Sequence, residues 1–487
     1  MPTPPVTYTR VLFVSATCGL ALSACATGND IVPALTPHDI ATLRPGAMIA
    51  AATASDSSAT NRDHWWQSWR DPQLDMLIAA IGEGVPSIDA ALARLAQASS
   101  ERDGIRSDRL PRIMGSANAS GAYFPDHATW PEPYAGGTGS EGSLRADVRY
   151  RFDFWGKRRQ AVLAANARFS RTGEEVRDAL LILRTALVEA YAGLDADYRL
   201  RDLTEAALDR HLDIAKLLAQ RERAGLATDI DAVDAREAIT DARAEVARLD
   251  GEISRKRYRI AALLGRDPAF AEGLMRPALK PSADPAPTSA IPAAWLGYRP
   301  DVAAARAGVE AAAHDIGVAR AAFYPDIDLT AFAGLQSLGL AHLLRAGSAT
   351  AGIGPALSLP IFEGGRLRAE LRGRTADYDA AVSRYNMTLT TALQQVADAL
   401  ATLNAERARK AEADAAVAHW RHVAILQRLR EARGLSSTMD RLTAEAALLR
   451  SERAVVEATA RRTLGQTALV RALGEGAPPS SSSRQVQ

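Results

Sequence analysis

The stretch 144–154, LRADVRYRFDF, alternates apolar and charged residues without a break. Because successive side chains of a β-strand point to opposite faces, this period of two predicts a strand with one apolar and one charged face. Its length, about 11 residues, suits a tilted strand that crosses a bilayer. In a soluble sheet the apolar face would pack on a core, whereas in a transmembrane barrel it would meet lipid and the charged face would line a wet lumen.

Three further stretches share this pattern. Residues 351–361 and 327–335 carry an apolar side chain at every second position, and 113–124 do so more weakly. Pro355 and Pro360 are unusual residues for a paired strand. Four strands cannot close a barrel, and open sheet edges are not tolerated in lipid. If the chain spans a membrane it must therefore oligomerise, and two, three or four copies would supply roughly 8, 12 or 16 strands.

Long helical patterns follow each pair of expected strands. Apolar residues recur at steps of three and four over 161–223 and 367–433, which is the spacing of a coiled-coil seam. Each stretch is ~60 residues long, or about 90 Å of helix, against ~12 residues for an ordinary globular helix. Gly225 and Gly434 stand where these helices should end, with capping residues directly after them. We therefore expect two helical hairpins with these glycines at their tips.

The long helices help to decide whether the strands form a soluble sheet or a membrane barrel. Because the long helices use their apolar seams on each other, no other element offers the sheet a core, which favours a membrane barrel. A soluble coiled-coil rod that spans the periplasm without a pore is the second interpretation. An enzyme is a distant third, because the histidines lack metal-binding spacing and no catalytic set can be assembled. Gly137, Gly139 and Gly142 match a dinucleotide fingerprint, but they lie in an expected loop over 125–142.

The chain contains an internal duplication. Residues 225–231 align with 434–440, and 264–265 align with 473–474 at the same offset. Pro86 and Pro111 match Pro300 and Pro325 at a slightly different offset. We predict the following domains: a lipoprotein signal peptide over 1–24, a lipidated N-terminal segment and equatorial region over 25–85, a first repeat over 86–265, an equatorial linker over 266–299, a second repeat over 300–474, and a disordered tail over 475–487.

The N-terminus has the pattern of an export signal. Arg10 precedes an apolar run over 11–22, and the sequence Leu-Ser-Ala-Cys that ends at Cys25 resembles the lipobox of bacterial lipoproteins. In those proteins the cysteine is acylated and becomes the new N-terminus. The following Ala26 replaces the aspartate that usually signals inner-membrane retention. We therefore expect Cys25 to anchor the chain to the outer membrane, with an ordinary signal peptide as the alternative.

Charge and cysteine content exclude other classes. The 58 Lys and Arg residues nearly balance the 57 Asp and Glu residues, which argues against nucleic acid as a partner. Cys18 is the only other cysteine and lies in the expected signal peptide, so the mature chain would have no internal disulfide. We expect no cofactor other than the covalent lipid on Cys25.

Four stretches carry a resemblance to a known family. They are WWQSWRDP at 65–72, RPDV at 299–302, IGVARAAFYP at 316–325 and LPIFEGGR at 359–366. With them the chain resembles the TolC-like outer-membrane efflux proteins, and among these the lipoprotein branch that serves resistance-nodulation-division (RND) pumps. The resemblance implies a mainly α-helical homotrimer with a barrel of roughly 12 strands in the outer membrane and a helical tunnel through the periplasm.

The resemblance also implies partners and a task. An inner-membrane RND pump and a periplasmic adaptor would deliver small molecules to this channel, which would conduct them passively. The chain shows no nucleotide site that would supply energy. A type I protein-secretion conduit is the alternative within the same family. The identity of the transported substrate is not encoded in these patterns.

The family closes its periplasmic end at the hairpin tips with acidic residues. Carried over, this role falls on Asp231 and Asp440, and on Asp234, which shares a helix face with Asp231. Threefold symmetry would then form a ring of negative charge. Ser436 and Thr443 differ from the residues that some relatives have there, which leaves the details of the latch open. The alternative is that Asp231 and Asp440 only stabilise the starts of their helices.

Overall fold

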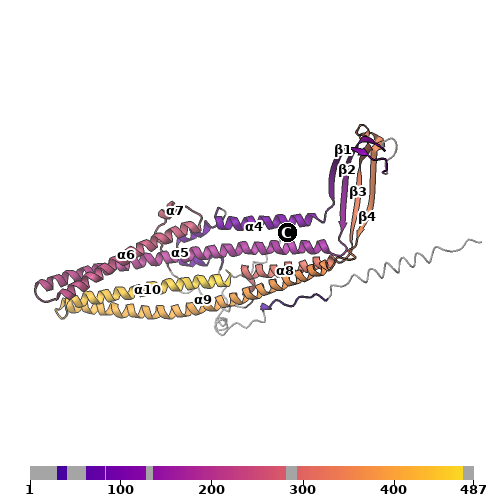
Figure 1. Ribbon diagram of the computed structural model, residues 1–487. Helices are drawn as coiled ribbons and strands as arrows, with labels where there is room; N and C mark the ends of the chain where they lie inside the picture. The colour runs from indigo at the N-terminus through magenta and orange to yellow at the C-terminus, as the bar shows by residue number, and fades with distance from the viewer. Residues whose placement is uncertain (1–29, 41–61, 83, 128–134, 281–292, 475–487) are drawn as a thin grey trace, which may run out of the picture. The chain divides into compact units, whose positions relative to one another are not determined.

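The computed structural model describes residues 30–40, 62–82, 84–127, 135–280 and 293–474 (Figure 1). The expected signal peptide, Cys25 and the C-terminal tail lie outside these residues. The chain divides into two compact units, which are described separately below. Unit 1 comprises 1–37, 95–172 and 305–385, and unit 2 comprises 38–94, 173–304 and 386–487. Each unit therefore contains parts of both sequence repeats.

The same order of main elements occurs twice along the chain. The first series is α4 (Pro86–Ser107), β1 (Arg112–Phe124), β2 (Gly137–Phe152), α5 (Lys157–Arg223) and α6 (Asp229–Leu263). The second is α8 (Pro300–Ala321), β3 (Asp326–Leu338), β4 (Ala349–Ser358), α9 (Arg366–Ala432) and α10 (Thr438–Leu473). The minor elements are η2 (Arg62–Trp69), α3 (Pro72–Ala79), α7 (Pro268–Glu272), η3 (Ala293–Tyr298), η4 (Leu340–His342) and η5 (Ala346–Ser348). The prediction of a mainly helical chain with four strands is confirmed.

Unit 1 contains one antiparallel sheet with the strand order β1-β2-β3-β4. Its register places apolar residues opposite one another across all four strands, as in the row Ile113, Val148, Ala331 and Ile353. The predicted alternation is therefore confirmed. Pro355 of β4 pairs with Leu329 of β3. Within the described residues β4 is an edge strand, and at an edge the missing N–H of proline is tolerated.

The glycine-rich stretch is more ordered than the sequence predicts. The predicted loop over 125–142 extends too far at its C-terminal end: β2 already begins at Gly137, which pairs with Phe124. A Cβ at Gly139 would collide with the ring of Phe124, which is 2% exposed. Gly139 therefore makes room for a buried aromatic ring on the neighbouring strand, which a composition-based interpretation cannot detect.

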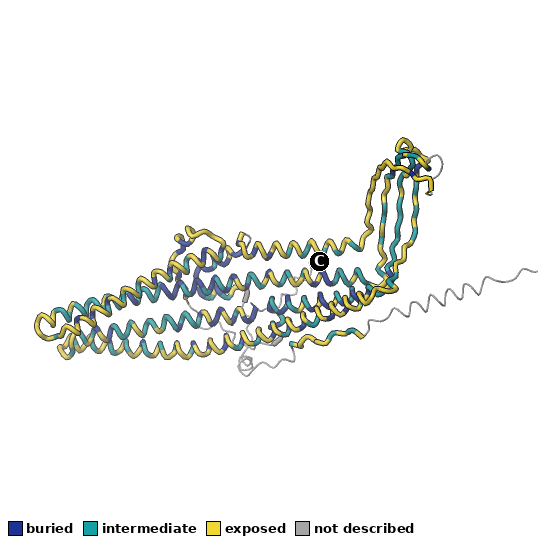
Figure 2. The backbone as a smooth tube through the Cα atoms, in the orientation of Figure 1, coloured by how far each residue is buried: buried dark blue, intermediate teal, exposed yellow. Residues whose placement is uncertain are grey.

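The helical seams are buried as their spacing predicts. The α5 residues Leu187 and Leu194 are fully buried, and Val382, Leu389 and Val396 on α9 are at most 1% exposed. Figure 2 shows buried and half-buried positions along the long helices. On α9 the buried positions recur at steps of three and four, with exposed positions between them, whereas residues 187–197 of α5 are buried or half-buried on all sides. Apolar packing along the helices thus holds the hairpins together.

The tryptophan-rich motif forms the core of unit 2 near α3. Trp66 and Trp69 pack with the buried side of α5. The Asp71 carboxylate caps α3 by accepting hydrogen bonds from the backbone N–H groups of Gln73 and Leu74. It also accepts one from the Tyr191 hydroxyl at 2.9 Å. The motif therefore ties the N-terminal segment of unit 2 to the long helix α5.

Among the described residues, no helix is both long enough and apolar enough to cross a membrane.

Candidate functional site

Both hairpin tips have the same backbone construction. Gly225, between α5 and α6, has φ +73°, and Gly434, between α9 and α10, has φ +69°. The Leu226 N–H donates to the Arg221 carbonyl at 2.7 Å, and the Leu435 N–H donates to the Arg430 carbonyl at 2.8 Å. This is the closure of a helix C-terminus by a left-handed residue, for which glycine has the lowest steric cost. The structure thus places both predicted glycines in the turns that reverse the chain.

Asp231 and Asp440 cap the helices that follow these turns. The Asp231 carboxylate accepts hydrogen bonds from the backbone N–H of Thr228 at 2.8 Å and from its hydroxyl at 2.7 Å. Asp440 does the same with Ser437 at 2.9 and 2.8 Å. These backbone and side-chain hydrogen bonds hold the pKa of both carboxyls below its ordinary value. Both aspartates therefore stabilise helix starts, whatever further role they have.

Asp234 differs from the two capping aspartates. It is exposed one turn after Asp231, and no hydrogen bond or ion pair holds its carboxylate within the described part of the chain. The tip region also carries basic side chains: Arg221 and Arg430 both contribute to the lowered pKa of Asp440. The tips are therefore of mixed charge, whereas sequence analysis singled out only their acidic residues.

A buried carboxylate joins three helices further along α10. Glu445 has a side chain that is 9% exposed, and it contacts Arg428 of α9 at 2.8 Å, Arg441 of α10 at 3.1 Å and Arg210 of α5 at 3.4 Å. Burial by itself would raise the pKa of Glu445, but the hydrogen bonds from Arg428 and Arg441 hold it below the ordinary value. This cluster connects the first hairpin to the second by charge. Sequence analysis did not find it.

A second ionic contact also joins the hairpins. Arg453 of α10 contacts the Glu245 carboxylate of α6 at 3.0 Å and donates a hydrogen bond to the Thr204 hydroxyl of α5 at 3.1 Å. Arg248 binds the same carboxylate at 2.7 Å, and these contacts lower the pKa of Glu245 to about 2. The Glu245 and Arg453 positions are 208 residues apart, so no local pattern in the sequence indicates the contact.

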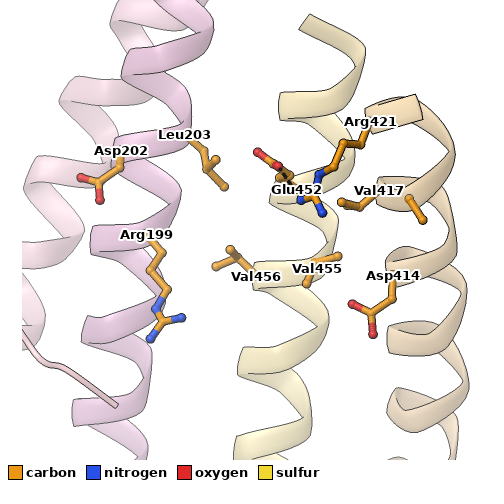
Figure 3. A pocket seen from close by; sticks show the side chains of 10 residues that line it. Arg199, Asp202, Leu203, Asp414, Val417, Arg421, Glu452, Val455 and Val456 are labelled. Atoms are coloured by element: carbon orange, nitrogen blue, oxygen red, sulfur yellow. Dashed lines mark hydrogen bonds and ion pairs between the residues drawn. The ribbon is translucent and has the colours of Figure 1, made fainter. Parts of the chain in front are cut away.

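An open groove lies between α5, α9 and α10 in unit 2 (Figure 3). It has a volume of about 610 Å³. Arg421 and Glu452 form an ion pair at 3.4 Å in its wall, and Val417, Val455 and Val456 also line it. The groove combines apolar walls with paired charges, and its lining residues do not include a nucleophile beside a general base. No cluster of metal-binding side chains occurs in the described ranges.

The sheet of unit 1 has two chemically different faces. Opposite the apolar rows, Arg145 pairs with Asp147 at 2.6 Å, and Arg151 lies 3.7 Å from Asp328. On the apolar face, Ile113 is 73% exposed and Ile353 is 76% exposed in the single chain. A large apolar surface exposed on a sheet indicates a partner surface of the same character.

Comparison with known proteins identifies the family. The model of the outer membrane efflux protein family matches residues 77–266 and 292–475. The fusaric acid resistance protein FusA of Burkholderia cepacia is 36% identical over 379 residues, which are 77% of this chain and 71% of FusA. The multidrug resistance outer membrane protein MdtP of Escherichia coli K12 is 31% identical over 439 residues, which cover 86% of this chain and 88% of MdtP.

Solved structures agree with the family assignment. The outer membrane protein VceC of Vibrio cholerae has a TM-score of 0.78 and 33% identity, with 86% of this chain and 99% of VceC covered. The outer-membrane channel OprN has a TM-score of 0.76 and 26% identity, with 92% of this chain and 98% of OprN covered. The predicted resemblance and the predicted outer-membrane location are confirmed. The chain belongs to the outer membrane efflux protein family and is the outer-membrane channel component of an efflux pump.

Proposed function

We propose that three copies of this chain form one passive conduit with no catalytic step. Their sheets close into a barrel in the outer membrane, and their helical hairpins form a tunnel in the periplasm. An inner-membrane RND pump supplies the energy, and a periplasmic adaptor joins the pump to the tunnel. The transported solutes are small molecules.

The exposed apolar face of the sheet carries this proposal. Ile113, Ile353 and Leu357 are each at least 68% exposed on that face, while the opposite face carries paired charges. β1 and β4 are the edges of the described sheet. An edge with unpaired N–H and C=O groups is not tolerated in lipid, so β1 of one copy must pair with β4 of the next.

The N-terminal segment supports a lipid anchor at Cys25. Ile31 packs against Ile316, Ala319 and Leu371 at the sheet-proximal end of α8 and the start of α9. The backbone N–H groups of Ala34 and Leu35 donate to the Asp379 carboxylate at 3.1 and 3.0 Å. Six residues from Cys25 to Ile31 span at most ~20 Å. An acyl chain on Cys25 would thus reach a membrane surface at the base of the sheet.

The hairpin tips supply the proposed gate. Asp231 and Asp440 hold the first turns of α6 and α10 in place, and Asp234 adds an exposed charge on the next turn of α6. In a trimer this charge is repeated three times around the axis, where cations or basic side chains bound between the copies hold the tips close together. An adaptor that binds the tips can therefore change the width of the opening.

Single-channel recording in planar bilayers tests this function. We expect small conductance steps from the purified wild-type trimer and larger steps from Asp234→Asn, which removes a tip charge without removing a cap. Asp229→Asn is the matched control, because Asp229 is an exposed residue of the same helix start. Folded trimers that pass no current in any of the three forms would refute the conduit. Equal steps from all three would leave the conduit intact and refute the gate role of Asp234.

A further inference from the structure

Two arginines face each other directly across the first strand pair. The register of the sheet pairs Arg112 of β1 with Arg149 of β2. Directly opposite residues lie on the same face with their Cβ atoms ~5 Å apart, and like charges in such positions destabilise the sheet. Both side chains are exposed. The sheet thus retains an unfavourable pair of positive charges.

Most other charged side chains on this face have a partner of opposite charge, and the Glu141 carboxylate accepts a hydrogen bond from the Ser120 hydroxyl at 3.0 Å. Arg145 has Asp147, Arg151 has Asp328, and Lys157 has Asp326 at 3.3 Å at the base of the sheet. In the arginine pair, Arg112 contacts Asp108 at the end of α4. For Arg149, the described residues provide no carboxylate and no hydrogen-bond partner. Within the described residues, Arg149 is therefore a positive side chain without a counter-charge, beside Arg112, whose charge Asp108 offsets.

The row that contains this pair ends at a residue without a side chain. Continuing across the sheet, Arg149 lies opposite Thr330, which lies opposite Gly354. A Cβ added at Gly354 would have no neighbour within 4 Å, so the row ends in open space. The row itself contains no carboxylate, so Asp108 at the end of α4 is the acidic contact of the pair within the described residues.

We propose that Arg112 and Arg149 form an anion-binding row inside the outer-membrane barrel, which favours solutes that carry carboxylate or similar oxyanion groups. The inference rests on the proposed barrel, because strand alternation places both arginines opposite the apolar row of Ile113 and Ile353. When that row meets lipid, the arginines face the lumen. Three copies then place roughly 6 guanidinium groups at one level of the pore.

The chemistry of the row suits oxyanions. A guanidinium group presents planar N–H donors that match the two oxygens of a carboxylate. A pore wall of low dielectric strengthens the field of such a ring and raises the local concentration of anions. The row differs from the hairpin tips, where acidic and basic side chains are mixed.

The test compares three forms of the full trimer: wild type, Arg112→Gln/Arg149→Gln, and the charge-retaining Arg112→Lys/Arg149→Lys. In a KCl gradient, the reversal potential of wild type and of the lysine form should lie nearer the chloride equilibrium potential than that of the glutamine form. Citrate added on the extracellular side should block the glutamine form at a concentration roughly tenfold higher or more. This difference should shrink as the ionic strength rises.

A binding measurement tests the anion-binding row even when closed tips prevent current through the channel. Pyranine, a fluorescent trisulfonate, should bind wild-type trimers in nanodiscs and lose at least roughly tenfold in affinity in the glutamine form. Equal selectivity, equal citrate block or equal pyranine affinity in the wild-type and glutamine forms would overturn the anion-binding row. Trimers that bind pyranine through the arginines but never conduct would instead refute the proposed conduit.

Discussion

Glu445 is a single charged residue that links helices from distant parts of the sequence. Its carboxylate is nearly buried and receives guanidinium groups from α5, α9 and α10. A buried charge without a partner is strongly destabilising, and three partners on three helices therefore couple the positions of those helices. The contact between Arg210 and Glu445 spans 235 residues of sequence. Neither periodicity nor motif spacing predicts such a contact, whereas the local capping role of Asp231 was foreseen as an alternative.

We expect Glu445→Gln to lower the free energy of unfolding by about 2–4 kcal/mol, because three guanidinium groups lose their buried counter-charge. The measurement is the unfolding midpoint of the purified trimer in denaturant. Glu452→Gln is the matched control: it lies on the same helix with a side chain 30% exposed and a single partner at 3.4 Å. The control should lose less than about 1 kcal/mol. Equal losses in both variants would contradict a special role of Glu445.

The lowered pKa of Glu245 leads to a prediction of how the stability of the fold depends on pH. Hydrogen bonds from Arg248 and Arg453 lower its pKa from 4.5 to about 2 in the folded chain. A carboxyl with a lowered folded pKa stabilises the fold fully above its unfolded pKa, and this contribution disappears as the pH falls through the folded pKa. The melting temperature should therefore fall between about pH 4.5 and pH 2. In Glu245→Gln this fall should be smaller, and an unchanged pH profile would refute the assignment.

At the scale of elements, the long helices and the strands were predicted well because their signals are local. The expected helix over 161–223 corresponds to α5, Lys157–Arg223, and the one over 367–433 corresponds to α9, Arg366–Ala432. Each rests on a periodicity that repeats many times. The glycine-rich start of β2 was missed because it pairs without apolar alternation, and its order depends on Phe124 in the neighbouring strand.

The tip glycines give a prediction for these elements. Gly225→Ala should destabilise the first tip by about 1–2 kcal/mol, because alanine is strained at φ +73°. A Cβ there would have no neighbour within 4 Å, so the cost is conformational and not steric crowding. Hydrogen exchange of the amides at the start of α6 should become faster.

Gly251→Ala is the control for that substitution. Gly251 lies within α6, where an added Cβ also meets nothing within 4 Å and no left-handed conformation is required. Alanine there should stabilise the helix by about 0.5–1 kcal/mol. Slower exchange at the tip in Gly225→Ala than in wild type would show that the turn does not need glycine.

At the scale of the whole molecule, the assembly depends on the face of the sheet that a single chain leaves exposed. The sequence predicts which residues share that face, since alternation is a property of each strand. The number of copies is not predictable in this way, because four strands per chain are compatible with several closed barrels. The register adds the information that the apolar rows are continuous across all four strands.

Ile353→Asp tests the assembly. A carboxylate on a lipid-facing position should be destabilising, by less than the ~2–4 kcal/mol that Arg or Lys costs at the membrane centre, and should reduce the yield of trimers in the outer membrane. Thr350→Asp is the matched control, because the register places Thr350 opposite Gly334 on the other face of the same strand pair. Membrane fractionation followed by native electrophoresis measures the outcome. Normal assembly of Ile353→Asp would show that this face does not contact lipid.

The equal lengths of α5 and α9, 67 residues each, restrict how this chain can change during evolution. A deletion of one heptad from α5 alone would leave Gly225 about 10 Å short of its earlier position, while Gly434 would stay in place. Deletions that are not whole heptads would also rotate the seam away from its partner. Insertions and deletions in these arms should therefore occur as matched sets in both halves of the duplicated gene. The length of one half thus restricts the length of the other.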